Sequence, residues 1–99
     1  MMYVFYCEDG DNALEGRRLH RPEHVARLKA LQNEGRLVLA GPHPAVDSPD
    51  PGEAGFTGSL IVAEFPSLEE ARSWAAADPF SRFGVYSRVT VKPFLKTLP

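Results

Sequence analysis

Only one cysteine occurs among the 99 residues, and no apolar run approaches the ~20 residues that a membrane-spanning helix needs. Cys7 therefore cannot form an internal disulfide, and a lone free thiol is typical of a reducing compartment. The first residues contain no basic segment and soon reach Glu8 and Asp9, so we expect no signal peptide. These absences predict a cytoplasmic protein that does not associate with membranes.

The chain also has no excess of basic residues. Eleven lysines and arginines stand against thirteen acidic residues, which gives a formal net charge of -2. A nucleic-acid-binding domain normally carries a basic patch or stripe, so we expect no nucleic-acid partner. Hydrophobic residues make up 43% of the sequence and charged residues 24%, an ordinary globular composition. Ninety-nine residues are enough for one domain, which we expect to span residues 1–99.

Four segments have the apolar, β-branched or aromatic character of strands. They cover residues 3–7, 36–40, 57–65 and 85–94. Gly41-Pro42-His43-Pro44 is expected to end the second strand, and the proline- and glycine-rich stretch 42–58 is expected to form a long loop. Residues 10–20 are polar and charged without an apolar stripe, so they are predicted to form a loop or short turn.

The first helix is predicted to begin near Pro22, which suits a first helical turn, and to end near Asn33 before Gly35. Helical spacing places His24, Leu28 and Leu31 on one stripe, and this stripe is expected to face the core.

A second helix is predicted to open at Ser67. Ser67 and Glu70 have the spacing of a capping box. Ala71 and Ala75 belong to its inner stripe, and the helix is expected to stop at about Asp78, because a residue before proline resists helical geometry.

The element order is therefore βαββαβ, which predicts an α+β fold of the ferredoxin-like type with a four-stranded antiparallel sheet. Two helices would cover one face of the sheet. The strands are apolar on both faces, since Val4 and Tyr6 alternate with Tyr3, Phe5 and Cys7. Monomers rarely expose such a surface, so we expect a homodimer, or a higher assembly of dimers, with two sheets packed face to face.

The buried position of His24 requires a partner, because an unpaired buried polar group costs a few kcal/mol. Asp78 is the candidate, since the two helices of a βαββαβ domain lie side by side. A carboxylate on one imidazole nitrogen would orient the ring and leave the other nitrogen free to move a proton. The same pair would serve equally as a structural clamp between the helices.

Several stretches resemble the YciI-like proteins, which are built on a YCII-related domain. They include Arg21-Pro22-Glu23-His24, Ala54-Gly55-Phe56-Thr57-Gly58-Ser59, Asp78-Pro79-Phe80 and Val91-Lys92-Pro93-Phe94, and the resemblance covers essentially the whole chain. It implies a dimeric α+β barrel and an active-site pair that maps onto His24 and Asp78. It also implies kinship with a dehydrochlorinase of chlorinated hydroxyhydroquinones and, more widely, with muconolactone isomerase and heme-associated enzymes.

Three further residues are candidates for substrate binding. Arg21 lies one helical turn before His24 and, with Arg17 and Arg18, forms a basic cluster suited to a carboxylate or phosphate. Ser59 could present a hydroxyl to the same cleft, and His43 is a weaker candidate in a proline-rich turn. For each of them an ordinary structural role is the competing interpretation. The histidines do not have the close spacing of a metal site, so no metal is expected.

Two functions remain open. In the first, His24 is a general acid/base, oriented by Asp78, of a lyase or isomerase that acts on a small organic acid or aromatic molecule without a cofactor. In the second, the protein is a non-catalytic homodimer that binds a small metabolite or a protein partner, and the pair is a clamp. Heme or metal association through a histidine is a weaker third hypothesis.

Overall fold

The computed structural model describes residues 1–99 and contains four strands, three α-helices and one 3₁₀ turn. In chain order these are β1 (Met2–Asp9), α1 (Ala13–Asn33), β2 (Leu37–Pro44), η1 (Gly52–Ala54), β3 (Phe56–Glu64), α2 (Leu68–Ala77), α3 (Pro79–Arg82) and β4 (Tyr86–Phe94). The predicted βαββαβ order is confirmed, with the short α3 as an addition after α2.

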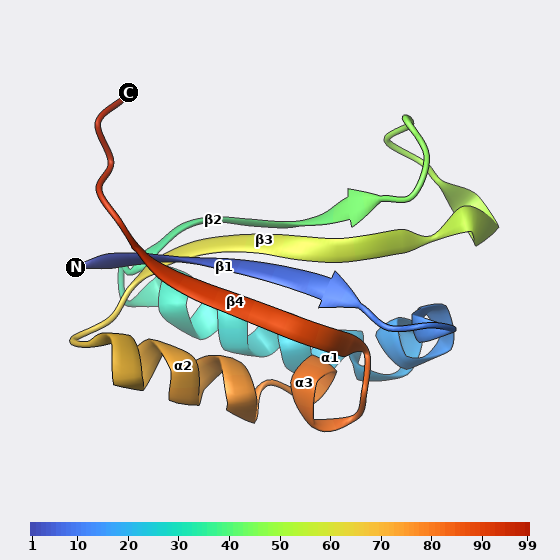
Figure 1. Cartoon of the computed structure of the whole chain (residues 1–99), viewed down its shortest axis with the longest axis horizontal. Coiled ribbons are helices and arrows are strands. Elements are labelled where there is room, and N and C mark those ends of the chain that lie inside the picture. Colours follow the sequence, from blue (N-terminus) through green and yellow to red (C-terminus); the bar gives the residue numbers. More distant parts are fainter.

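The strands form one antiparallel sheet in the order β2-β3-β1-β4. In the register, Phe5 lies opposite Ile61 on one side and Val91 on the other. The three helices lie on one face of this sheet, as Figure 1 shows with the sheet above and the helices below. The predicted ferredoxin-like architecture is confirmed.

The core fills the space between the sheet and the helices. Tyr3, Phe5 and Cys7 point into it from β1 and are at most 5% exposed, while Ala71 and Ala75 face them from α2. The predicted inner stripes of both helices are confirmed. The Ser67 hydroxyl also accepts a hydrogen bond from the Glu70 amide at 3.1 Å, as the capping spacing indicated.

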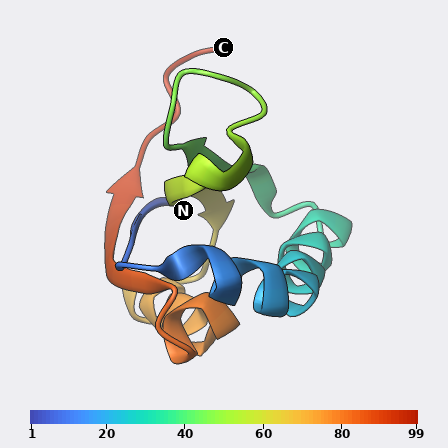
Figure 2. The ribbon, with the colours of Figure 1, turned by 90° about the vertical axis from the view of Figure 1, so that its right-hand side faces the viewer.

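No helix covers the opposite face of the sheet (Figures 1 and 2). This face carries apolar side chains. Tyr6 is 49% exposed and Leu39 is 48% exposed, and Val4 and Leu60 occupy alternating positions with the buried residues of their strands. The loop between β2 and β3 and the C-terminal segment both extend toward this side (Figures 1 and 2).

The prediction that residues 10–20 form a loop was wrong. Helix α1 begins at Ala13, and Pro22 lies within it instead of in its first turn. The side of the helix that faces the core here carries small and charged residues. A Cβ atom on Gly16 would lie only 2.8 Å from Val85 Cγ2, so glycine permits this close approach. Packing thus overrides the low helix propensity of Gly16 and Pro22.

The predicted end of the second strand at residue 40 was also wrong. Strand β2 continues through Gly41, Pro42 and His43 to Pro44. It is an edge strand, and proline is tolerated there because its missing N–H can face away from the neighbouring strand. No helix in the structure has the length and apolar character required to cross a membrane.

Candidate active site

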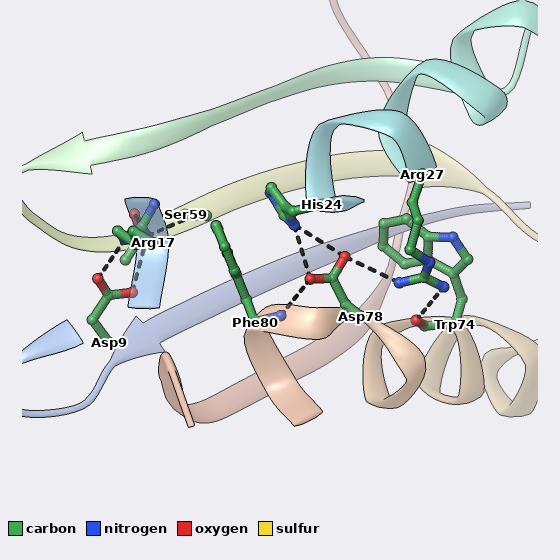
Figure 3. A network of polar contacts seen from close by, with 9 residues as sticks. Asp9, Arg17, His24, Arg27, Ser59, Trp74, Asp78 and Phe80 are labelled. Carbon is green, nitrogen blue, oxygen red and sulfur yellow. Dashed lines mark hydrogen bonds and ion pairs between the residues drawn. The ribbon is translucent and has the colours of Figure 1, made fainter. Parts of the chain in front are cut away.

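His24 and Asp78 meet between α1 and the start of α3. His24 Nδ1 lies 2.9 Å from Asp78 Oδ1 and 3.0 Å from Oδ2 (Figure 3). The two residues are 7% and 2% exposed, respectively. Because a carboxylate accepts hydrogen bonds, the proton between them belongs to Nδ1, and the neutral ring then keeps its lone pair on Nε2.

Asp78 has more partners than the histidine. Its carboxylate also accepts from Arg27 Nη1 at 3.0 Å and from the backbone N–H of Phe80 at 2.9 Å, which makes Asp78 the N-cap of α3. Arg27 is held in turn by the Trp74 carbonyl, at 2.8 Å from Nη2. The carboxylate is therefore fixed by three donors, and it fixes the orientation of the His24 ring.

The His24 ring also stacks on an aromatic side chain. Its centroid is 4.0 Å from that of Phe80, with 13° between the ring planes. Tyr86 packs edge-on against Phe80, at 5.5 Å between centroids. The imidazole therefore has little freedom to rotate away from Asp78.

A cavity of about 510 Å³ lies beside this pair, between α1 and strands β2 and β3. His24 lines it, and its Nε2 makes no hydrogen bond within the chain and is not sealed from solvent. Apolar side chains supply much of the wall, among them Leu28, Phe56, Ile61 and Phe80. The geometry can therefore present one imidazole nitrogen to a small molecule with an apolar body.

The rim and floor of the cavity carry positive charge. Arg17, Arg18, Arg21 and Lys29 are the charged residues that line it, and no carboxylate does. Arg21 is exposed on α1, as the basic cluster suggested. This distribution of charge favours an anionic ligand.

Ser59 and Arg17 form a second polar group in the cavity wall. Arg17 Nη2 donates to Ser59 Oγ at 3.0 Å and to the Gly58 carbonyl at 2.9 Å. The same guanidinium holds the Asp9 carboxylate through Nε at 2.6 Å and Nη2 at 2.9 Å. Ser59 lines the wall, as the sequence suggested. Sequence reasoning grouped Arg17 with Arg18 and Arg21 but preferred Arg21, and it did not recognise Asp9 as the partner of Arg17, because residues 10–20 were not recognised as helical.

His43, the remaining sequence candidate, does not line this cavity. Its ring packs against Tyr6 at 5.7 Å between centroids, and its Nε2 is buried without a hydrogen-bond partner. In the register it lies opposite Gly58, one position away from the residues of β2 that face the cavity. The structure therefore brings His24, Arg21 and Ser59 to one cavity, with Asp78 bonded to His24 outside the cavity lining, and leaves His43 outside the cavity.

The structure offers no cluster of three His, Cys, Asp or Glu side chains that could hold a metal ion. Cys7 lies in the core behind the cavity, and burial raises the pKa of its thiol from 9.0 to about 12. Burial also raises the pKa of the Tyr86 hydroxyl. Both groups are therefore neutral and unreactive at physiological pH.

Comparison with known proteins places this chain in a family. Residues 1–95 match the YCII-related domain. The chain belongs to the YCII-related domain family. Protein YciI of Escherichia coli is 59% identical to this YCII-related chain over 96 residues, which cover 97% of the chain and 98% of YciI.

Two further proteins extend the comparison. Derivative of benzaldehyde biosynthesis cluster protein C of Emericella nidulans is 35% identical over 95 residues, which cover 92% of the chain and 97% of that protein. The 5-chloro-2-hydroxyhydroquinone dehydrochlorinase of Burkholderia phenoliruptrix, solved in complex with 2,5-dihydroxybenzoquinone, has a TM-score of 0.84 and 24% identity, and the match covers 96% of the chain and 94% of that structure. At this identity the likeness shows that the YCII-related chain shares its fold.

Proposed function

We propose that this YCII-related domain is a cofactor-independent enzyme of the lyase or isomerase kind. His24 Nε2 removes or delivers a proton on a small organic acid or aromatic molecule bound in the cavity, and Asp78 orients the ring and stabilises its charged form. Arg21 and Ser59 bind the polar groups of the substrate. Such reactions need only proton transfer.

One observation carries this proposal. The side chain of His24 is almost fully buried, its Nδ1 is held by the Asp78 carboxylate at 2.9 Å, and its Nε2 remains unbonded at the cavity wall. A histidine that only joined two helices would have no need of a lone pair directed to a cavity of about 510 Å³. The relation to a biosynthesis-cluster protein supports a small-molecule substrate.

The alternative function is that of a non-catalytic binding protein in which the pair is a clamp. The observation in its favour is the number of contacts on Asp78, which joins α1 to α3 through His24 and Arg27 and caps α3. These contacts would exist whether or not a proton moves. The two functions differ in what happens when His24 is replaced.

A hydrogen-exchange assay separates them. The wild-type chain is incubated in deuterated buffer with a panel of hydroxylated aromatic acids and small unsaturated carboxylic acids, and deuterium incorporation at carbon is followed by NMR. We expect the best substrate of the wild-type chain to exchange at least about 100-fold more slowly with His24→Ala and Asp78→Asn, the usual size of a general acid/base contribution.

His20→Ala is the matched control for this assay. His20 lies on α1 one turn before His24, and it stacks on Phe83 at 4.3 Å outside the cavity. The substrate should therefore exchange with the His20→Ala variant at the wild-type rate. Retention of the wild-type rate by His24→Ala, in a variant that is folded by circular dichroism, would favour the clamp.

We also propose that the protein is a homodimer whose sheets pack face to face. The outer sheet face carries Val4, Tyr6, Leu39 and Leu60, and no helix of the chain covers it. Burial of this apolar surface against a second copy would remove it from water. The cavity lies on the other side of the sheet, so this dimer would leave it open.

Tyr6→Glu tests the dimer. Tyr6 is 49% exposed in the single chain, so the substitution should spare the fold of one subunit but place two carboxylates in the proposed interface. We expect sedimentation at micromolar concentration to give a dimer for the wild-type chain and a species of 10.9 kDa for the variant. Leu19→Glu, at a 70% exposed position of α1, should remain dimeric. A monomeric wild-type chain would contradict the proposal.

A further inference from the structure

Arg17 is the most deeply buried cation of the chain, and its donors are not all used within the protein. The residue is 8% exposed. Its Nε and Nη2 groups bind Asp9, the Gly58 carbonyl and Ser59, whereas Nη1 makes no hydrogen bond with the chain. Nη1 is also not sealed from solvent, and Arg17 lines the cavity. Two N–H groups of a rigidly held guanidinium are therefore available to a ligand.

Ser59 supplies a third donor at the same place. Its Oγ accepts from Arg17 Nη2 at 3.0 Å. A guanidinium has no acceptor, so the hydroxyl hydrogen of Ser59 must be directed elsewhere. Ser59 is 3% exposed and lines the cavity beside Arg17. Polarisation by the cation strengthens the serine hydroxyl as a donor.

The environment of these donors selects their ligand. Arg17 lies 5.2 Å from the centroid of Phe56 and 5.2 Å from that of Phe80, so the donors sit beside aromatic surface. Asp9 balances the charge of Arg17, and the attraction for an anion therefore comes from the directed donors and from the cationic rim. A carboxylate on a flat apolar body satisfies both requirements, because it offers one oxygen to Nη1 and the other to Ser59 Oγ.

We infer that Arg17 Nη1 and the Ser59 hydroxyl form a carboxylate-binding subsite at the end of the cavity away from His24. Figure 3 shows the arrangement, with the Phe80 ring between His24 on one side and Arg17 with Ser59 on the other. The inference rests on the proposed function in that it concerns the same cavity, and it specifies the substrate as a small aromatic or otherwise planar carboxylic acid. Arg17 and Ser59 are binding residues here, and proton transfer stays with His24.

Benzoate and benzamide are the probes, since they have the same ring and differ in charge. Binding to the folded full chain is measured by NMR titration. We expect wild-type protein to prefer benzoate by at least about tenfold, the effect of one hydrogen bond to a charged group. Ser59→Ala and Arg17→Lys should reduce that preference to less than about threefold. The lysine keeps a cation for Asp9 but has a single nitrogen, so it lacks the separate Nη1 that the guanidinium fork presents to the ligand.

Arg72→Gln is the control, because it removes one charge at an exposed position of α2 outside the cavity. The benzoate preference should change by less than about threefold in this variant, as screening weakens exposed charges. An unchanged preference in Ser59→Ala and Arg17→Lys, an equal loss of preference in Arg72→Gln, or no benzoate binding to the wild-type chain would each overturn the subsite.

His24→Ala separates this inference from the proposed function. If the subsite is correct, the variant keeps the benzoate preference whatever happens to its turnover. Loss of proton exchange tests His24 alone, and loss of benzoate selectivity tests Arg17 and Ser59 alone. Either conclusion can therefore fail while the other stands.

Discussion

Replacement of Asp78 with alanine is expected to lower the free energy of unfolding by about 3–5 kcal/mol, the usual cost of removing one partner of a buried ion pair. The variant leaves the His24 Nδ1–H, one N–H of Arg27 and the backbone N–H of Phe80 without their acceptor. For a chain of this size the midpoint of thermal unfolding should fall by more than about 10 °C.

Thermal unfolding followed by circular dichroism measures this loss, at one fixed protein concentration because a dimer would make the midpoint concentration-dependent. Glu69→Ala, at an exposed position of α2, is the control and should stay within about 0.5 kcal/mol of the wild-type chain. Asp78→Asn should lower the free energy of unfolding by less than Asp78→Ala does, since the amide oxygen can still cap α3. A loss below about 1 kcal/mol in Asp78→Ala would show that the observed contacts contribute little.

Replacement of Arg17 with methionine is expected to destabilise the chain by a similar amount, about 3–5 kcal/mol. The Asp9 side chain is only 4% exposed, so the variant would leave a buried carboxylate without its cation. The double variant Asp9→Asn, Arg17→Met removes both charges and should be less destabilised than the sum of the single variants. We expect a coupling energy of at least about 1.5 kcal/mol from the double-mutant cycle.

Denaturant titration of the four proteins provides the cycle. The neighbouring ion pair between Arg18 and Glu15 is the matched control, because it lies on the same helix at 3.9 Å with side chains that are 62% and 85% exposed. Its coupling energy should be below about 0.5 kcal/mol. Equal coupling energies for the two pairs would mean that burial does not strengthen the interaction between Arg17 and Asp9.

The architecture and the His24–Asp78 contact were accessible from sequence because they leave periodic signals. The stripe of His24, Leu28 and Leu31 fixes which face of α1 is buried, and the Asp78-Pro79 step fixes where α2 ends. The spacing of Ser67 and Glu70 marked the start of α2 in the same way. The catalytic role of the pair stays a prediction.

The first two turns of α1 could not be predicted because their buried face carries no large apolar side chain. Ala13 and Gly16 are small and Arg17 is charged, so they do not form the period of large apolar residues that reveals a helix. Arg17 can be buried because Asp9 of β1 and Ser59 of β3 accept hydrogen bonds from its guanidinium. The seven-residue spacing of Arg17 and His24 would place both side chains on one face of a helix. This signal could be used only if the helix were known to extend back to Arg17.

Strand β3 contributes a constraint of its own at the position before Ser59. A Cβ atom on Gly58 would lie 2.0 Å from the Cys7 carbonyl oxygen, so only glycine fits there. The Gly58 carbonyl accepts from Arg17 at 2.9 Å. The sequence shows a glycine before a strand serine, but the close neighbour in β1 becomes visible only in the folded sheet.

Helix α1 carries both Arg17 and His24 on the wall of the cavity and so fixes the interval between them. Arg17 and His24 are seven residues apart, which corresponds to about 10.5 Å along the axis. A loop could lengthen or shorten that interval by small steps. A helix cannot, because one inserted residue would turn His24 by about 100° away from Asp78. The interval between the Arg17 guanidinium and the His24 imidazole is therefore set by the helix itself and not by a loop.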